Sequence, residues 1–470
     1  MRRRTFLASA AAGAAQTRTA RRPNILLITA DDLGLCLSCY GETRIKTPHL
    51  DSLAGSGVRF RTAYVTQASC SPSRSSMFTG LYPHGTGQYG LANTGLALHD
   101  NLHQATIPAV LKKAGYRTGI IGKLHVEPED TFPFDFLHKN SANTRKVRDV
   151  ATLAGGFLSA KSEDPFFLMV NYSDPHAFRL PDNPREWNFP PQVDGLPENP
   201  YPPGPTAVFD FQQIDTPEQR VRVAGYYNAI QRLDTGIGML MDTLRKSGKE
   251  QETVILFVGD HGPPFARGKT TTYESGLRVP YMVRWPGLSK PAVSDAMVST
   301  VDLAPTIFDA AGVTSPVRMH GRSLRPVLAN SKAEWRRYLA GEFHFHGATP
   351  FYPRRAIRDD RYKLIHNLLA GRNKPSTGID GDKAYPISRD SRYDGTPVRA
   401  AFDTFANPPE FELYDLRGDP VEFRNLAGQP ALKSTEDRMK QALLDWRKES
   451  SDPFLDPAMI EKMARRTVQA

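Results

Sequence analysis

Cysteine is scarce in this chain, and long apolar runs are absent. Only three cysteines occur among 470 residues, and three cannot build a disulfide framework for a chain of this size. No uninterrupted apolar stretch is long enough to span a bilayer, so we expect no transmembrane segment. The hydrophobic fraction of 40% is still ample for a large core, and the length is typical of a globular chain of two domains.

Patterns typical of nucleic-acid binding are also missing. The sequence has no zinc-finger spacing, no basic region joined to heptads and no RNA-binding aromatic pattern. Its net charge of +10 nevertheless favours an acidic partner, so we expect a sulfated polysaccharide rather than a nucleic acid. Cys36-x-x-Cys39 has the spacing of a redox pair or half a zinc site, but no second pair or neighbouring histidine supports either function.

The N-terminus has the pattern of a targeting segment. Arg3-Arg4-Thr5-Phe6-Leu7 precedes a small, weakly apolar stretch from Ala8 to Ala15, as in a twin-arginine export signal. A basic tail without that role is the alternative. We predict that residues 1–20 are a signal segment and that the protein is exported, to the periplasm or outside the cell.

The most informative stretch begins at Cys70 and reads Cys-Ser-Pro-Ser-Arg, continuing to Thr79-Gly80. Because proline favours the first position of a helix, Pro72 predicts that Cys70 lies at a helix start, where unpaired backbone N–H groups attract an anion. The alternative is a buried structural cysteine, which is a common fate of this residue.

Four apolar, β-rich runs end in charged or imidazole side chains. The runs are 24–29, 118–121, 166–171 and 253–258. The side chains that follow them are Asp31-Asp32, Lys123 with His125, Asp174-Pro175-His176 and Asp260-His261. In doubly wound α/β sheets ligands bind outside the carboxyl ends of the strands, so these residues are predicted to form one site.

Helical periodicity alternates with these strands and supports an α/β fold with a large, mostly parallel sheet. One helix is predicted over 107–114, and a long one from Pro217 to Leu244, closed by Gly248. The predicted inward residues of the long helix are Val221, Ala224, Tyr227, Ile230, Leu233, Ile237 and Leu240.

Two later segments differ from this pattern. Nine prolines between Pro181 and Pro205 exclude a regular helix or central strand, so we expect a surface loop at the mouth of the site. Short strands at 361–366 and 411–414 precede a helix with Leu432, Met439, Leu443 and Trp446 inward. We therefore predict a catalytic domain over 21–335 and a smaller α+β subdomain, with a short antiparallel sheet, over 336–470.

These motifs together resemble type I sulfatases of the alkaline phosphatase superfamily, in the order seen in that family. They are Asp31-Asp32, Cys70-x-Pro-Ser-Arg74, Gly122-Lys123-x-His125, Asp174-Pro-His176, Asp260-His261-Gly262 and the run from Glu412 to Glu422. The resemblance covers nearly the whole mature chain and implies an alkaline-phosphatase-like sandwich fold and a sulfatase activity.

Within that family, other runs are similar to the heparan N-sulfatase (sulfamidase) branch. They are Gly87-Gln-Tyr-Gly90, Thr118 to Val126, Phe132 to Phe136, Tyr352-Pro-Arg-Arg355, Leu364 to Leu368 and Asp445-Trp-Arg447 with Asp452-Pro453. The implied substrate is the N-sulfate of terminal N-sulfoglucosamine in heparan sulfate or heparin. An O-sulfatase acting on another sulfated polysaccharide, a phosphonate or phosphate ester hydrolase and a glycan-binding protein without catalysis remain alternatives.

The resemblance also implies how the site is equipped. Cys70 would be converted to formylglycine by a formylglycine-generating or anaerobic sulfatase-maturing enzyme, and its hydrate would be the nucleophile. One Ca²⁺ per chain would be held by ligands from several motifs, with His261 a less usual one because Ca²⁺ prefers oxygen. The implied metal-site residues are Asp31, Asp32, Cys70, Asp260 and His261.

The remaining roles follow from the same resemblance. Lys123 and Lys269 would bracket the sulfate, and Arg74 would steady the nucleophile and the metal site. His176 would protonate the leaving group, and His125 would be the base that regenerates the aldehyde. The residues assigned to a substrate subsite are His84, His344, His346 and Arg354. A homodimer is a further prediction.

Overall fold

The computed structural model describes most of the chain. The described residues are 21–139, 144–180, 183–189, 194–347 and 349–466. The predicted signal segment at 1–20 lies outside them and stays a prediction. Among the described residues, no helix combines the length and apolar character that a membrane crossing requires.

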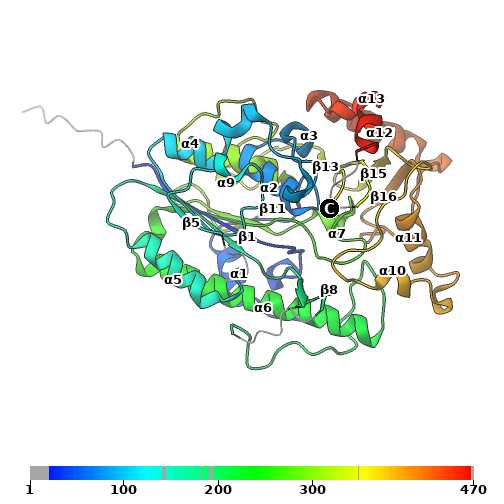
Figure 1. Ribbon diagram of the computed structural model, residues 1–470, viewed down its shortest axis with the longest axis horizontal. Helices are drawn as coiled ribbons and strands as arrows, with labels where there is room; N and C mark the ends of the chain where they lie inside the picture. Colours follow the sequence, from blue (N-terminus) through cyan, green and yellow to red (C-terminus); the bar gives the residue numbers. More distant parts are fainter. Residues whose placement is uncertain (1–20, 140–143, 181–182, 190–193, 348, 467–470) are drawn as a thin grey trace, which may run out of the picture.

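A large mixed sheet forms the centre of the molecule (Figure 1). In spatial order its eight strands are β11 (Ala292–Ser294), β2 (Val58–Phe60), β10 (Tyr281–Arg284), β9 (Thr253–Gly259), β1 (Asn24–Ala30), β6 (Phe166–Tyr172), β4 (Arg117–Gly122) and β5 (Phe136–His138). Of these strands only β10 runs antiparallel to its neighbours. The mostly parallel sheet predicted from the sequence is confirmed, and its four predicted strands match within one residue at each end.

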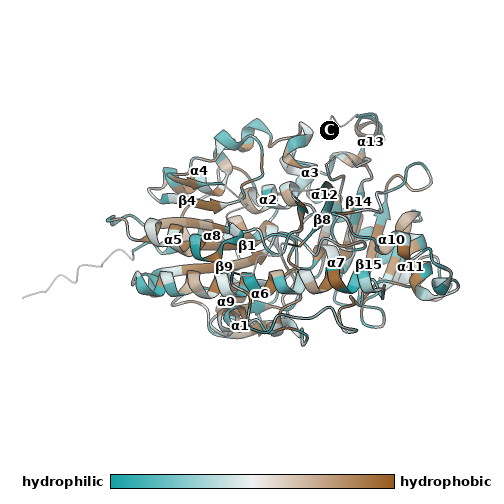
Figure 2. Cartoon of the chain, turned by 60° about the horizontal axis from the view of Figure 1, so that its bottom comes forward, coloured by the Kyte–Doolittle hydropathy of each residue, from teal (hydrophilic) through white to brown (hydrophobic). Residues whose placement is uncertain are grey.

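Helices cover both faces of this sheet, as Figure 1 shows. One face packs against α1 (Pro48–Gly55), α5 (Val147–Leu158) and α6 (Pro217–Lys246), and the other against α2 (Cys70–Thr79), α4 (Ile107–Lys113) and α8 (Leu303–Ala311). Successive side chains of β1 point to opposite faces of the sheet, so a hydrophobic core forms on each face. Ile25 and Leu27 lie in the core with α2, whereas Leu26 and Ile28 lie in the core with α6. Figure 2 shows these central strands in the brown of apolar residues, with hydrophilic positions on the outer faces of the helices.

Helix α6 confirms the predicted span to within two residues, and six of the seven predicted inward residues are buried. Thr216 caps its N-terminus by accepting a hydrogen bond from the backbone N–H of Gln219, and Gly248 follows its end with φ of 73°. The prediction for Val221 was wrong, because this side chain is 55% exposed. The first turns of α6 bury polar Gln219 and Arg222 instead, against the loop that carries Asp382.

Short elements complete this part of the chain. They are α3 (Pro83–Thr86), α7 (Glu274–Leu277), α9 (Arg325–Ala329), the pair β3 (Ala63–Tyr64) and β12 (Val298–Ser299), and the antiparallel pair β7 (Phe178–Leu180) and β8 (Asn183–Asn188). The β7–β8 pair lies partly within the proline-rich segment that was predicted to be a loop. It forms a separate two-stranded sheet, so it does not place proline in a central strand.

A four-stranded antiparallel sheet follows, with helices beside it. Its strands are β13 (Leu339–Phe343), β14 (Arg354–Arg358), β15 (Tyr362–Asn367) and β16 (Phe411–Asp415), and the helices of this region are α10 (Ala384–Ile387), α11 (Pro397–Ala406), α12 (Lys433–Glu449) and α13 (Pro457–Ala464). Helix α12 packs on β14 and β15 through Met439 and Leu443. The predicted small antiparallel sheet is confirmed, whereas the domain boundary at 335 stays a prediction.

Candidate active site

The ends of four neighbouring parallel strands bring the predicted residues together. Asp31 follows β1 and Lys123 follows β4, and the Lys123 Nζ lies 2.8 Å from the Asp31 Oδ2. Asp260 follows β9, and its Oδ1 accepts a hydrogen bond of 2.9 Å from the backbone N–H of Asp32. The strand order β9, β1, β6, β4 explains this convergence, because parallel strands end at the same edge of a sheet.

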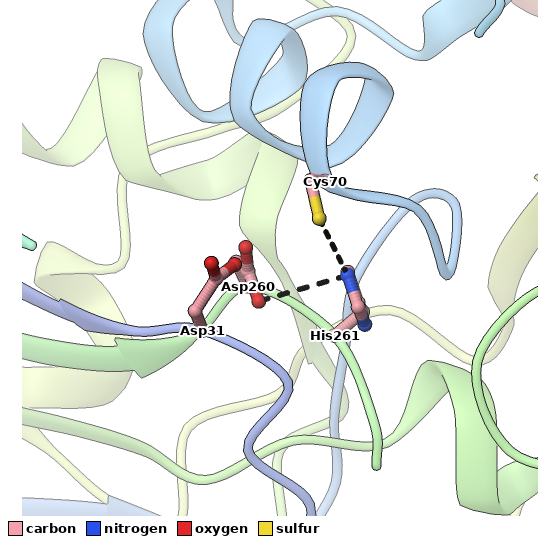
Figure 3. Close-up of side chains that lie close together, drawn as sticks. All are labelled: Asp31, Cys70, Asp260 and His261. Atoms are coloured by element: carbon pink, nitrogen blue, oxygen red, sulfur yellow. Dashed lines mark hydrogen bonds and ion pairs between the residues drawn. The ribbon is translucent and has the colours of Figure 1, made fainter. Parts of the chain in front are cut away.

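Cys70 is the first residue of α2 and points into the same cluster. Figure 3 shows its side chain directed from the start of α2 toward His261, and the Sγ lies 3.3 Å from the His261 Nε2. Because the helix begins at Cys70, Pro72 lies two residues further into the first turn, not at the first position as predicted. Proline is still tolerated there, since the first backbone N–H groups of a helix have no helical acceptor.

Arg74 lies one turn along α2 and pairs with two acidic residues of the cluster. Its guanidinium is fully buried and lies 3.0 Å from the Asp260 Oδ2 and 3.4 Å from the Asp31 Oδ1. It also donates to the backbone carbonyl of Lys123. Arginine suits this position because its planar fork satisfies several acceptors at once.

The cluster has the donors of a metal site. Ligand atoms of Asp31, Cys70, Asp260 and His261 all lie within 4.8 Å of one another, and each of these residues is buried. Figure 3 shows the carboxylates of Asp31 and Asp260 side by side, with His261 beside them. The Asp32 Oδ1 lies 3.2 Å from the His261 Nε2, so a third carboxylate faces the group. Such a donor set, three carboxylates with one imidazole and the Cys70 sulfur, fits a divalent cation.

Lys269 lies in the loop after β9, and its side chain reaches Asp32 of the cluster. Its Nζ lies 3.0 Å from the Asp32 Oδ1, 2.8 Å from the Asp380 Oδ2 and 3.4 Å from the His176 Nε2. The His176 Nε2 in turn lies 3.8 Å from the Asp32 Oδ2. Lys269 is only 1% exposed, which is far from the solvated lysine expected of a loop.

Three cationic side chains act on Cys70. Burial opposes ionisation of the thiol, but the charges of Lys123, Lys269 and His261 hold the pKa of Cys70 well below its ordinary value. The same field would stabilise any anion placed at this point, including the oxygens of a sulfate group.

His125 and His176, two of the histidines that line the cavity, have pKa values shifted in opposite directions. Burial and the charge of Lys123 lower the pKa of His125, so this imidazole is neutral and can accept a proton. For His176 burial acts in the same direction, but the carboxylate of Asp32 outweighs it and raises the pKa. One histidine is thus suited to be a base and the other an acid.

Backbone strain is concentrated at the same residues. Asp32 and His125 have φ of 64° and 57°, in the left-handed region that non-glycine residues rarely adopt. Gly122, just before Lys123, has φ of 92°, and a Cβ there would lie 2.2 Å from the Asn171 carbonyl oxygen. Strained residues of this kind cluster at functional sites, where the surrounding structure fixes them.

Cys70 opens from this cluster into a cavity of about 740 Å³. Residues that line it include Cys70, Asn93, Thr94, Lys123, His125, His176, Arg179, Trp187, Lys269, His346 and Asp380. Of the four residues predicted for a substrate subsite, His346 lines this cavity and the other three do not. His84 is buried against Glu342, and His344 hydrogen-bonds to Gln67, while Arg354 lies in β14.

Several residues that line the cavity were not predicted from the sequence. Arg179 and Trp187 belong to the β7–β8 pair, and Asp380 belongs to the loop before α10. No strand end or family motif marks Asp380; the only signal is the turn-forming composition of Gly378-Ile-Asp-Gly381.

Cys36 and Cys39 lie outside this cluster as free thiols. Burial raises the pKa of each to about 12, so neither is a reactive thiolate at neutral pH. The structure therefore gives no support to a redox pair.

Comparison with known proteins defines the class. The sulfatase family model matches residues 23–313, and the model of the C-terminal part of N-sulphoglucosamine sulphohydrolase matches residues 259–373. Human N-sulphoglucosamine sulphohydrolase is 32% identical over 95% of this chain and 94% of its own length. An ulvan-active sulfatase of Formosa agariphila is 30% identical over 92% of this chain and 81% of its own length.

A solved structure supports the fold. A protein in complex with its substrate D-glucosamine-2-N,6-O-disulfate superposes with a TM-score of 0.68 at 22% identity, over 92% of this chain and 99% of that one. The chain therefore belongs to the sulfatase family, and it is a hydrolase of the sulfatase class. Within that family it is similar to N-sulphoglucosamine sulphohydrolase along nearly its whole length.

Proposed function

We propose that this protein is a formylglycine-dependent sulfatase that removes the N-sulfate of terminal N-sulfoglucosamine in heparan sulfate or heparin. The observation that carries the proposal is the group of two lysines and two histidines that line the cavity with Cys70, in a chain 32% identical to the human sulfohydrolase. The substrate is thus a sulfated glycan with a free end that fits the cavity.

Two groups complete the site in this proposal. Cys70 is converted to formylglycine by a maturing enzyme, and the converted residue would hold one Ca²⁺ together with Asp31, Asp32, Asp260 and His261. When bound, the cation supplies Lewis-acid polarisation, and the hydrated aldehyde supplies the nucleophile. His261 is the ligand that makes the identity of the metal a question for experiment, because Ca²⁺ prefers oxygen.

The lysines position the sulfate group. The Lys123 and Lys269 ammonium groups face the Cys70 side chain from two sides and bind sulfate oxygens that gain charge as the bond to sulfur breaks. Arg74 is fully buried behind the acidic residues and holds them in place without reaching the substrate.

The histidines move the protons. His176 delivers a proton from Nε2 to the leaving nitrogen, which otherwise would depart as an unstable amide anion. His125 is the neutral base that takes a proton from the Cys70-derived group. Its Nδ1 is buried without a hydrogen-bond partner in the described part of the chain, so this ring has a free nitrogen inside the protein.

An O-sulfatase acting on another sulfated polysaccharide is the second candidate. The similarity to the ulvan-active sulfatase favours it, because that match is nearly as identical and covers almost as much of the chain. We also propose that residues 1–20 direct export and that the chain divides near 335; a homodimer stays a prediction.

The test begins with mass spectrometry of the peptide containing Cys70, to establish the aldehyde. Sulfate release is then measured from a heparan oligosaccharide ending in N-sulfoglucosamine and from one carrying only 6-O-sulfate. We expect release from the first alone, and none from a Cys70→Ala control. Release only from the second, or from neither by fully modified protein, would refute the N-sulfatase and leave an O-sulfatase that acts on another glycan.

A further inference from the structure

A carboxylate outside the predicted site faces the same cavity. Asp380 lines it together with Cys70 and His176, and its Oδ2 lies 2.8 Å from the Lys269 Nζ. Burial opposes ionisation, but Lys269 and His176 lower the pKa of Asp380 to about 2, so it is charged at neutral pH. Nothing in the proposed chemistry so far uses this carboxylate.

The loop that carries Asp380 is firmly anchored. The Asp382 carboxylate accepts hydrogen bonds from Gln219, Gln212 and the backbone N–H of Ala266, at 2.8 to 3.0 Å. Arg222 donates to the backbone carbonyl of Asp380 and to that of Trp187, at 2.8 Å for the second bond. These contacts tie the loop to α6 and to β8.

The local backbone fixes the direction of the Asp380 side chain. Asp380 has φ of 44°, in the left-handed region, and Gly381 follows with φ of 79°. A Cβ at Gly381 would lie 3.0 Å from both the Cβ and the carbonyl oxygen of Trp187, so little room exists for another residue. A carboxylate held in this way is preorganised for a ligand in the cavity, since it needs no reordering on binding.

Asp380 lies on the side of the cavity where the leaving group must be. Lys269 contacts both Asp380 and the His176 Nε2, the atom that delivers the proton to the leaving group. His346, which hydrogen-bonds to Ser69 at 2.9 Å, lines the cavity close to the same carboxylate. A leaving group that His176 protonates would therefore lie near the Asp380 carboxylate.

We propose that Asp380 accepts a hydrogen bond from the N–H of the sulfamate leaving group, and so selects N-sulfated over O-sulfated substrates. This inference rests on the proposed function. A sulfamate nitrogen carries a hydrogen to donate, whereas the bridging oxygen of a sulfate ester has only lone pairs, which the carboxylate repels. The S–N bond breaks as His176 protonates the nitrogen and the sulfur bonds to an oxygen of the proposed nucleophile, and the amine that leaves still donates an N–H to Asp380.

A site built to accept such a hydrogen bond discriminates against an analogue that lacks the donor, because the bridging oxygen of the ester then faces the Asp380 carboxylate with no hydrogen between them. This kind of selectivity is stronger than any that an apolar pocket can give. The ion pair with Lys269 also keeps the Asp380 carboxylate charged before the substrate binds.

The test compares Asp380→Asn with the native enzyme on two substrates, N-sulfoglucosamine and 4-nitrophenyl sulfate. Asparagine tolerates the left-handed backbone and keeps the shape of the side chain. We expect kcat/KM for N-sulfoglucosamine to fall by at least about tenfold, the value of a charge-assisted hydrogen bond. The value for the aryl ester should change far less, so that the ratio of the two falls.

Product inhibition supplies an independent measurement. Glucosamine should inhibit the native enzyme, and its inhibition constant should rise in Asp380→Asn, whereas weak inhibition by glucose should not change. Asp380→Glu keeps the charge beside Lys269 but displaces the oxygen atoms, so it should retain ester hydrolysis and lose sulfamate hydrolysis. Asp403→Asn, at an exposed aspartate paired with Arg389, is the control that should change neither.

The outcomes separate the two proposals. If the native enzyme releases no sulfate from N-sulfoglucosamine, the proposed function fails and this inference with it. If the native enzyme is active but Asp380→Asn loses both activities in equal proportion, Asp380 acts only by holding Lys269, and the inference alone is overturned. An unchanged inhibition constant for glucosamine would overturn it as well.

Discussion

A few charged residues of the cavity determine the electrostatic environment of Cys70. Cys70 lines the cavity with Lys123 and Lys269, while Asp31 and Asp32 pair with the same two lysines. Each buried charge therefore has an opposite charge within hydrogen-bond distance, which is the condition for keeping charges in a protein interior. The two lysines can serve both the acidic cluster and a sulfate group.

The role of His176 leads to a prediction about leaving groups. We expect His176→Ala to lower kcat on N-sulfoglucosamine by about 10² to 10⁴, the usual contribution of a positioned acid. On 4-nitrophenyl sulfate the loss should be much smaller, because nitrophenolate leaves without a proton. Steady-state kinetics on both substrates, with His366→Ala of the C-terminal sheet as a control, would check this. Equal losses on the two substrates would rule out proton delivery by His176.

At the scale of elements, a buried ionic network joins the antiparallel sheet to the end of α12. Glu342 of β13 accepts a hydrogen bond from the backbone N–H of His84 at 2.8 Å, and its carboxylate pairs with the His84 ring at 2.6 Å. Arg355 of β14 lies 3.5 Å from Glu342 and 2.8 Å from Asp452, which follows α12. His84, assigned to a substrate subsite from the sequence, thus stabilises the contact between α3 and β13.

This network predicts a pH-dependent stability. Burial would raise the pKa of Glu342, but His84 and Arg355 lower it to about 2, against an ordinary value of 4.5. Its stabilising effect is therefore complete above about pH 4.5 and is lost as the pH falls toward 2, where the folded carboxylate takes up its proton. Glu342→Gln should cost about 3 to 5 kcal/mol at neutral pH, as for other broken buried ion pairs.

Urea denaturation between pH 2 and 7 would measure this effect. The difference in unfolding free energy between native and Glu342→Gln proteins should shrink as the pH falls below 4.5. Glu410→Gln, at an exposed glutamate near His366, should show almost no difference at any pH. A constant difference across the range would contradict the low pKa of Glu342.

At the scale of the whole molecule, the site connects strands and loops that are far apart in the sequence. Asp31, Cys70 and Asp260 are separated by up to 229 positions, yet their ligand atoms lie within 4.8 Å. A cation held by such a set binds only the folded chain, so binding should stabilise the entire catalytic region.

Calcium binding can be tested by thermal unfolding of the protein freed of metal with a chelator. We expect added Ca²⁺ to raise Tm, with a stabilisation of about 2.7 kcal/mol when the free ion is at 100 times Kd. Asp31→Asn should abolish this shift, whereas Asp394→Asn, at an exposed aspartate paired with Arg399, should leave it intact. A shift with Zn²⁺ but not with Ca²⁺ would assign the metal differently and explain the imidazole of His261.

The sequence by itself determined the parallel sheet, its strands and the motif residues, because buried strands are continuous apolar runs and the polar groups directly follow them. The sequence did not show that Asp380 faces the cavity, that His84 lies outside it or that Val221 is exposed. Each of these depends on which segments pack together across long distances in the chain. The local sequence pattern indicates the hydrophobic periodicity and the ends of a helix or strand. Tertiary packing decides which polar side chain faces the cavity and which is paired and buried.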